Sequence, residues 1–264
     1  MTSRYERLDK ILVQRGLAPS REKAQGLILA GCVRVDGHCV TQCGRKIPEN
    51  ADIQVQGQDH PYVSRGGFKL AHALDYFGLN VAGLVIMDVG ASTGGFTDCL
   101  LQRGAGKVYA VDVGYGQLAW KLRQDPRVIV LERCNIRHLD RSAIPESVDG
   151  AVVDVSFISL KLVLPKVLTF LKPEAFLVAL IKPQFEAGRE HVGKGGVVKD
   201  PNVHEAVCRA VAETVQSLKC QVLGIIPSPI LGPKGNREFL LAARYARDNR
   251  TPSPDTGLSP AHRL

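Results

Sequence analysis

The residues with the clearest chemical potential form a glycine-rich segment, Asp88-Val89-Gly90-Ala91-Ser92-Thr93-Gly94-Gly95-Phe96, after the apolar run 84–87. An apolar strand, a glycine-rich turn and a helix are how doubly wound α/β folds hold nucleotide-type cofactors, because glycine lets a ligand approach the backbone. The spacing Gly90-x-x-x-Gly94-Gly95 differs from the dinucleotide pattern Gly-x-Gly-x-x-Gly. It suits a smaller ligand with an adenosine and an amino-acid tail, such as S-adenosylmethionine (SAM). On its own, the segment fits an ordinary α/β turn equally well.

Polar side chains follow the carboxyl ends of further predicted strands. Asp88 and Asp112 end the first two, and Asn135 follows the third. Ligands of open α/β sheets bind outside this edge, where Asp112 suits two ribose hydroxyls and Asn135 suits an adenine edge. Capping or turn formation explains each residue alone, but jointly they indicate one adenosine site. The expected cofactor-binding residues are Asp88, Gly90, Ala91, Ser92, Thr93, Gly94, Gly95, Phe96, Asp112, Asn135 and Asp154.

Two lysines and two acids form a second candidate group. Asp154 and Lys182 belong to the fourth and fifth predicted strands, and Lys182 directly follows an apolar run. A lysine is costly to bury there unless it is paired, so a purely structural Asp154–Lys182 salt bridge is the simplest alternative to catalysis. Lys69, in a predicted helix, and Glu238, at the start of the last strand, could likewise be solvated side chains.

The elements that must position these residues alternate along the chain. Strands are expected at 85–88, 108–112, 128–131, 150–155, 177–181, 221–226 and 238–243, with helices between them. A helix is also expected from Ser64 onward, with Leu70, Leu74 and Phe77 on its apolar face. This alternation is typical of a mainly parallel sheet covered by helices.

The first 60 residues have a different pattern. Apolar residues recur at helical spacing in two short segments; Gly16 ends the first, Ser20 is a candidate N-cap for the second, and Gly31 ends it. Val33-Arg34-Val35-Asp36-Gly37 then predicts a hairpin turn. Basic residues crowd this segment, either as a solvated face or as a nucleic-acid surface. The formal net charge of +8 for the whole chain favours an anionic partner.

This segment resembles the S4 RNA-binding domain. The matching residues are Arg7-Leu8-Asp9-Lys10-Ile11-Leu12, Gly16-Leu17-Ala18-x-Ser20-Arg21-x-x-Ala24 and Ile28-x-x-Gly31-x-Val33-x-Val35-x-Gly37. The resemblance implies that basic side chains contact phosphates of structured RNA, and such contacts position a protein without reading sequence. The expected RNA-binding residues are Arg4, Arg7, Lys10, Arg15, Arg21, Lys23, Arg34 and Arg65.

Lys69, Asp154, Lys182 and Glu238 look like the Lys-Asp-Lys-Glu tetrad of FtsJ-like ribose 2′-O-methyltransferases. With the S4-like segment ahead of them, the chain closely resembles the TlyA family, also called hemolysin A, from about residue 8 to 243. The resemblance implies a Rossmann-like α/β fold, a SAM-dependent methyltransferase domain with a mainly parallel seven-stranded sheet, behind a small α+β S4 domain. The segments that agree are Ser64-Arg65-Gly66, Gly90-Ala91-Ser92-Thr93-Gly94-Gly95-Phe96-Thr97, Asp112-Val113-Gly114-Tyr115-Gly116-Gln117-Leu118, Asp125-Pro126-Arg127-Val128, Ser156-Phe157-Ile158-Ser159-Leu160, Lys182-Pro183-Gln184-Phe185-Glu186 and Gly195-Gly196-Val197-Val198.

The activity that the resemblance implies is methyl transfer from SAM to the 2′-hydroxyl of a cytidine in ribosomal RNA. This weak nucleophile must be oriented in line with the departing sulfur and must lose its proton. Lys182 is expected to act as general base or to orient the hydroxyl, Asp154 to hold Lys182, and Lys69 and Glu238 to complete a polar cradle. Because duplex RNA keeps the hydroxyl along its minor groove, we expect the target nucleotide to be flipped or distorted.

The predicted domains are 1–60 (S4-like), 61–63 (linker), 64–248 (methyltransferase) and 249–264 (a disordered tail). Seven scattered cysteines, no apolar run that could span a bilayer and no apolar N-terminal leader indicate a cytoplasmic protein with reduced thiols. Ribosomal RNA or ribosomal subunits are the expected partners, rather than a membrane or DNA. No metal is expected: Cys32, Cys39 and Cys43 lie near His38 but lack zinc-site spacing, so these cysteines are expected to fill the core.

Other functions compete with this one. A lytic hemolysin would need a membrane-spanning stretch and an export signal, and a non-catalytic RNA-binding or ribosome-assembly protein would not need the tetrad. A nicotinamide-dependent oxidoreductase is disfavoured by the glycine spacing. The basic segment 193–199 can fold over RNA phosphates or serve as a plain connector, and 232–236 is expected to be a loop beside Glu238.

Overall fold

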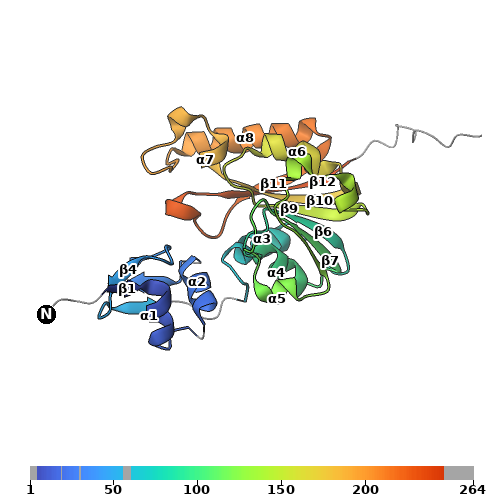
Figure 1. Ribbon diagram of the computed structural model, residues 1–264. Helices are drawn as coiled ribbons and strands as arrows, with labels where there is room; N and C mark the ends of the chain where they lie inside the picture. Colours follow the sequence, from blue (N-terminus) through green and yellow to red (C-terminus); the bar gives the residue numbers. More distant parts are fainter. Residues whose placement is uncertain (1–4, 19, 30, 56–60, 247–264) are drawn as a thin grey trace, which may run out of the picture.

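The computed structural model describes residues 5–18, 20–29, 31–55 and 61–246, which form a small N-terminal part and a larger part (Figure 1). Arg4 and the tail expected at 249–264 lie outside these ranges. The segment 61–63, expected as a linker, is attached to the larger part, because the Val63 backbone N–H donates a hydrogen bond to Asp98 Oδ2 at 2.7 Å.

The N-terminal part contains the expected helix pair and hairpin. The first helix ends before Gly16 (φ +68°) and the second before Gly31 (φ +71°), since glycine adopts this left-handed conformation at little cost. Ser20 Oγ accepts a hydrogen bond from Lys23 N at 3.2 Å, as an N-cap does. Asp36 and Gly37 both have positive φ, as a two-residue hairpin turn of type I′ requires. The elements are β1 (Tyr5–Arg7), α1 (Leu8–Gln14), α2 (Arg21–Leu29), β2 (Val33–Val35), β3 (His38–Cys39), β4 (Lys46–Pro48) and β5 (Ile53–Val55).

The larger part is built on a seven-stranded sheet of order β11-β12-β10-β9-β6-β7-β8. All neighbouring strands from β10 to β8 run parallel, whereas β12 lies antiparallel between β10 and β11. This confirms the mainly parallel α/β fold. The strands are β6 (Val85–Val89), β7 (Lys107–Val111), β8 (Val128–Leu131), β9 (Val148–Val153), β10 (Leu171–Ile181), β11 (Cys220–Pro227) and β12 (Phe239–Tyr245).

All seven expected strands are present, with shifted boundaries. β9 covers 148–153 rather than 150–155, so Asp154 follows the strand instead of lying in it. β10 begins at Leu171 rather than at residue 177. Its first residues include the polar Lys172 and Glu174 and the proline Pro173, and the pairing with β9 is irregular there.

Helices cover both faces of the sheet (Figure 1). Residues of β6 alternate between the faces: Ile86 packs into the core beneath α3 and α4, whereas Met87 and Val89 pack into the core beneath α6 and α8. Asp88 therefore belongs to the same face as Ile86. The helices are α3 (Gly66–Tyr76), α4 (Gly95–Gln102), α5 (Trp120–Arg123), α6 (Leu160–Leu168), α7 (Pro183–Glu186) and α8 (Pro201–Ser217).

Two expected absences concern membranes and metals. In the described part of the chain, no helix is long and apolar enough to cross a membrane. Among the same residues, no cluster of three or more His, Cys, Asp or Glu side chains could hold a metal ion.

Cys32 is buried as expected, but Cys39 is exposed, so the expectation that all three cysteines fill the core is wrong for Cys39. Cys39 falls at the end of β3, an edge strand whose two residues are both exposed.

Candidate active site

Lys182 lies at the carboxyl end of β10, immediately before α7. Its Nζ lies 2.6 Å from Asp154 Oδ1, as an ion pair without hydrogen-bond alignment, and donates a hydrogen bond to Ser156 Oγ at 2.8 Å. Asp154 follows β9, the parallel neighbour of β10, so both side chains leave the same edge of the sheet. The ion pair expected from the sequence is therefore present, and its lysine is buried.

Lys69 and Glu238 form a second pair at the same edge. Lys69 Nζ, in α3, lies 2.5 Å from Glu238 Oε2, which directly precedes β12. Both side chains are buried, so neither is the solvated residue that the sequence also allowed. Removing one partner would leave an uncompensated buried charge, which typically costs about 3–5 kcal/mol. Glu238 Oε1 has no hydrogen-bond partner among the described residues.

The sheet register brings the two pairs together. Ile181 of β10 faces Phe239 of β12, so Lys182 and Glu238 occupy the adjoining positions at the end of this strand pair. Asp154 stands at the same edge on the other side of β10. The structure therefore gathers all four residues of the expected tetrad around the carboxyl ends of β9 and β10.

The glycine-rich turn adjoins this group. Gly90 has a φ of +86°, and a Cβ there would overlap the carbonyl oxygen of Asp154. Gly94 has a φ of +96° at the start of α4, where a Cβ would overlap the Leu122 side chain. Close packing within the protein thus requires both glycines, a reason that the sequence did not reveal. The turn also lies directly against the strand end that carries Asp154.

Asp88 is fully buried beneath this turn. Thr97 Oγ1 donates a hydrogen bond to its Oδ2 at 2.6 Å, whereas Oδ1 has no partner among the described residues. Burial raises the pKa of Asp88 to about 7. The hydrogen bond from Thr97 acts against this shift, and the nearby negative charge of Asp154 adds to it. Because an unpartnered buried oxygen is costly, this carboxyl group is suited to accept a hydrogen bond or positive charge from a ligand.

Asp112 and Asn135 lie after β7 and β8, as expected for an adenosine site. Asp112 is half-buried and accepts backbone hydrogen bonds from Ser92 N at 2.8 Å and from Gly114 N at 2.6 Å. Each oxygen keeps a second lone pair, so the carboxylate can still accept bonds from ribose hydroxyls. Asn135 is exposed, and its Oδ1 caps a short helical turn by accepting from Arg137 N at 3.1 Å.

The remaining residues of the expected cofactor set build the turn itself. Ala91 and Phe96 are buried in the core that contains α3 and α4. The Thr93 carbonyl accepts a hydrogen bond from Ala119 N at 3.1 Å, which joins the turn to the start of α5. The Ala91 and Phe96 side chains and the Thr93 backbone thus hold the turn in place.

Two of the expected RNA-binding arginines converge on a buried acid. Arg7 binds Asp9 through two hydrogen bonds of 2.9 Å, and Arg21 Nε donates to Asp9 Oδ2 at 3.0 Å. These bonds, the Arg7 pair foremost, hold the pKa of Asp9 well below its usual range. The two guanidinium groups, Arg7 from the end of β1 and Arg21 from the start of α2, are thus held on the same carboxylate and remain partly exposed.

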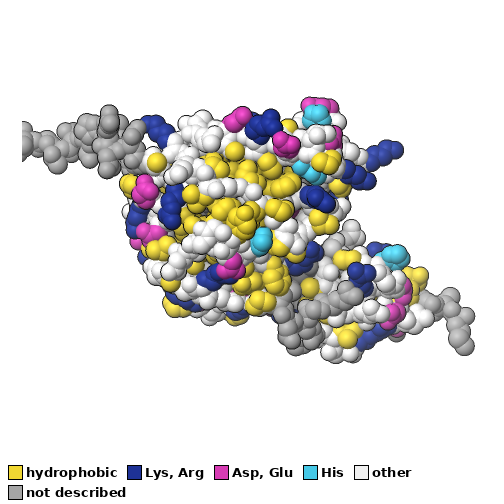
Figure 2. Space-filling model, turned by 180° about the vertical axis from the view of Figure 1, so that it is seen from behind, with side chains coloured by type: hydrophobic (Ala, Val, Ile, Leu, Met, Phe, Trp, Pro, Cys, Tyr) yellow, Lys and Arg dark blue, Asp and Glu magenta, His cyan; other side chains and the backbone are white. Residues whose placement is uncertain are grey.

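Most of the other expected RNA contacts also have partners within the chain, whereas Lys23 is exposed. Lysine and arginine side chains occur on the surfaces of both parts (Figure 2). The partners are Glu6 for Lys10 (3.5 Å), the Ala51 and Glu49 carbonyls for Arg15, the Gly37 carbonyl for Arg34 (2.9 Å) and the Leu231 carbonyl for Arg65 (3.3 Å).

Two residues that follow β9 were named in the sequence only within a matching segment, without a role at the site. Ser156 accepts the Lys182 hydrogen bond, and its position two residues after Asp154 is the signal that would have found it. Phe157 is 90% exposed and has a φ of +64°. The centroid of its ring lies 5.0 Å from that of Phe185. A bulky side chain rarely adopts this backbone conformation, and such strain gathers at functional sites.

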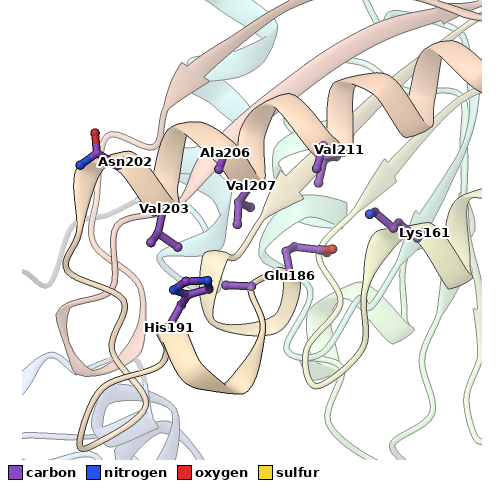
Figure 3. A pocket seen from close by; sticks show the side chains of 10 residues that line it. Lys161, Glu186, His191, Asn202, Val203, Ala206, Val207 and Val211 are labelled. Carbon is purple, nitrogen blue, oxygen red and sulfur yellow. The ribbon is translucent and has the colours of Figure 1, made fainter.

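A cavity of about 330 Å³ lies elsewhere, between α6, α7 and α8 (Figure 3). Its walls are mainly the apolar face of α8, with Lys161, Glu186 and His191 at its border. Glu186 is engaged there by the start of α6, since it accepts hydrogen bonds from Ser159 Oγ and Leu160 N. None of the cavity residues belongs to the expected cofactor, catalytic or RNA-binding sets.

Comparisons with known families divide the chain at the same place as the fold does. Residues 62–245 match the FtsJ-like methyltransferase family, and residues 6–53 match the S4 domain.

Individual relatives extend over both parts. The 16S/23S rRNA (cytidine-2′-O)-methyltransferase TlyA of Mycobacterium tuberculosis is 48% identical, over 93% of this chain and 92% of its own. Hemolysin A of Brachyspira hyodysenteriae is 43% identical, over 89% of this chain and 98% of its own. A solved structure from Streptococcus thermophilus, described as a hemolysin, has a TM-score of 0.73 and 42% identity, with coverage of 93% and 90%.

Proposed function

Because this chain belongs to the TlyA (hemolysin A) family of FtsJ-like methyltransferases with an S4 domain, we propose that it methylates the ribose 2′-hydroxyl of a cytidine in ribosomal RNA, with SAM as the methyl donor. The observation that carries this proposal is the gathering of Lys69, Asp154, Lys182 and Glu238 beside the glycine-rich turn. An RNA-binding protein without catalysis has no need of two buried lysine–carboxylate pairs at one sheet edge.

The residues around the turn fit SAM. When bound, SAM supplies an electrophilic methyl group on a positively charged sulfur. Asp88 offers a buried oxygen without a partner among the described residues, and Asp112 offers acceptors for ribose hydroxyls. In this proposal, a cationic ligand also favours the ionised form of Asp88, whose pKa is raised to about 7 in its absence.

We assign to Lys182 the task of orienting the attacking hydroxyl. Its ammonium group has three N–H donors; Ser156 accepts a hydrogen bond from one of them, and Asp154 holds the group by an ion pair. A remaining donor can hold the 2′-oxygen in line with the methyl group and stabilise that oxygen while its proton passes to a water molecule. Lys69 and Glu238 complete the polar wall on the other side of β10.

The exposed ring of Phe157 gives the site a surface for the target base. It lies next to Ser156, and aromatic side chains stack on bases with about 1–3 kcal/mol per base. A nucleotide flipped out of its helix would then place its base on this ring and its ribose toward Lys182. The S4 domain would hold the surrounding RNA through phosphate contacts.

The decisive experiment is transfer of radiolabelled methyl from SAM to isolated ribosomal subunits, followed by mapping of the modified nucleotide. We expect label on a cytidine 2′-oxygen. Label on a base, or no label on either subunit or on free ribosomal RNA, would contradict the proposal.

A further inference from the structure

Glu238 is held in place by the segment that precedes it. Gly232 packs so closely against the Glu238 carboxylate that a Cβ at this position would overlap Oε1. The segment closes on itself, because Gly232 N donates to the Asn236 carbonyl at 2.9 Å and Gly235 N donates to the Gly232 carbonyl at 3.1 Å. Residues 232–236 thus form a short strap over the acid that pairs with Lys69.

Asn236 ties this strap to a distant loop. Its side chain is buried, with 3% exposure, and its Oδ1 accepts a hydrogen bond from Val198 N at 3.1 Å. Its Nδ2 donates to the Gly196 carbonyl at 2.9 Å. The side chain must therefore accept and donate at once, which an amide can do and a carboxylate cannot.

A second contact fixes the same loop on the other side. His204, buried in the first turn of α8, hydrogen-bonds the Val198 carbonyl through Nε2 at 2.9 Å. Its ring also packs against Phe239, with 5.6 Å between ring centroids. Phe239 directly follows Glu238, so the loop is tied to the chain on both sides of the acid.

The tied loop, residues 193–199, carries Lys194 and Lys199 on its exposed surface. It turns back on itself through the pairing of Gly193 with Val197. Lys234 of the strap lies close to Gly196 of this loop. Lys194, Lys199 and Lys234 thus lie around the hydrogen bonds of Asn236. Their positive charges suit the phosphates of an RNA backbone that approaches the site.

We propose that Asn236 is a positioning residue for methyl transfer, because it ties the basic loop 193–199 to the strap that holds Glu238 against Lys69. This inference rests on the proposed function. It predicts that catalysis depends on the donor and acceptor groups of Asn236, although its buried side chain forms hydrogen bonds with the protein backbone.

The test is Asn236→Asp in the full-length protein, with kcat measured from pH 6 to pH 8.5 on ribosomal subunits. An ionised carboxylate repels the Gly196 carbonyl, whereas a protonated one can accept and donate as the amide does. At pH 8.5 we expect kcat to fall by about 10- to 100-fold, the effect of a small misplacement of reacting groups. The ratio of variant to wild-type kcat should rise as the pH falls, with SAM affinity unchanged.

Asn202→Asp, at an exposed asparagine of α8, is the matched control and should keep wild-type kcat throughout this range. A kcat of Asn236→Asp equal to that of the wild type, or a loss that is the same at every pH, would overturn the proposal. Amide hydrogen exchange at Val198 tests the Asn236–Val198 hydrogen bond without turnover. At high pH we expect the Val198 amide of Asn236→Asp to exchange faster than that of the wild type. Equal exchange rates at every pH would refute this tie. A wild type that methylates no ribosomal RNA would instead contradict the proposed function.

Gly232→Ala provides a second variant if Asn236→Asp does not fold at high pH. Its methyl group would press on the Glu238 carboxylate while the Asn236 bonds remain, so kcat should fall with SAM affinity unchanged. Gly26→Ala is the control, since a Cβ there meets nothing within 4 Å. Full kcat in Gly232→Ala would remove the strap from the mechanism.

Discussion

At the scale of single residues, the orientation of each lysine at this site depends on the groups that pair with its buried charge. Lys182 is held by Asp154 and Ser156, and Lys69 by Glu238, so each ammonium group has a fixed direction. A fixed donor next to a reacting oxygen needs no reorganisation during the reaction, which is the usual source of electrostatic catalysis. In the proposed function, Lys182 has a further N–H donor for the substrate, so it is the residue on which turnover should depend most.

Replacing Lys182 with alanine should lower kcat by about 10²- to 10⁴-fold, the range for loss of a positioned proton-transfer or orienting group. SAM affinity, measured separately by calorimetry, should stay near the wild-type value, because the expected cofactor residues remain. Lys161→Ala, at an exposed lysine of α6, is the control. Normal SAM binding with full turnover in Lys182→Ala would exclude Lys182 from the mechanism.

Asp88 should make stability depend on pH. Its pKa is raised by burial to about 7, whereas the unfolded chain has the ordinary value of 3.8. The favourable contribution of protonated Asp88 is therefore complete below pH 3.8 and is lost as the pH rises to about 7. Asp88→Asn should gain stability relative to the wild type over this window, on the order of a few kcal/mol.

Denaturant unfolding of Asp88→Asn and wild type between pH 4 and pH 8 measures this difference. Asp52→Asn, at an exposed acid, should show no such trend. A constant difference between Asp88→Asn and wild type across the whole range would show that Asp88 does not titrate in it.

At the scale of elements, the site exists because strand ends meet at one edge. β6, β9, β10 and β12 lie next to one another in the sheet, and each delivers part of the site where it begins or ends. The glycine-rich turn after β6 packs against the Asp154 backbone after β9. The glycine-rich turn therefore touches the backbone of the Asp154–Lys182 pair, and a change in one should move the other.

Gly90→Ala should expose this coupling. The variant forces alanine into a left-handed conformation and pushes a methyl group against the Asp154 carbonyl, so we expect a lower midpoint of thermal unfolding and a fall in kcat. Gly104→Ala is a matched control, because Gly104 has a similar φ of +85° but its Cβ would meet only Ala82, at 3.5 Å. Equal losses in the two variants would mean that backbone strain alone, and not the contact with Asp154, explains the effect.

At the scale of the whole molecule, the proposed function assigns RNA affinity to the N-terminal part and the chemistry to the larger part. The N-terminal part presents basic side chains, several of them fixed by partners such as Asp9, and the larger part contains the site. Arginines that are already held in place lose less conformational freedom when they bind phosphate, and this strengthens binding. Because phosphate contacts are the same for every nucleotide, they add affinity without sequence specificity. Binding of ribosomal RNA should accordingly weaken steeply with added salt.

Lys23→Ala isolates one phosphate contact in this surface. We expect weaker RNA binding and a plot of log affinity against log salt whose slope is smaller by about 0.7–0.9, the value for one released counterion. The kcat at saturating RNA should stay unchanged, because Lys23 lies far along the chain from the tetrad and in the other part. An unchanged slope would show that Lys23 does not contact RNA phosphate.

The sequence by itself determined the fold class and the S4-like segment, and it singled out the four residues of the expected tetrad. Strand–helix alternation follows from the local hydrophobic pattern, and motif residues keep their spacing whatever surrounds them. Strand ends were less certain, as β9 and β10 show, because polar residues such as Lys172 can stand inside a strand when neighbouring strands hold it.

Only the tertiary structure decided how these residues are paired. Lys69 and Glu238 are 169 positions apart, and their contact depends on β12 inserting antiparallel between β10 and β11. The same holds for Gly90 against Asp154 and for Asn236 against the loop 193–199. Local patterns set which face a side chain takes within its own element, whereas distances between elements arise from packing the whole sheet, which no short window of sequence contains.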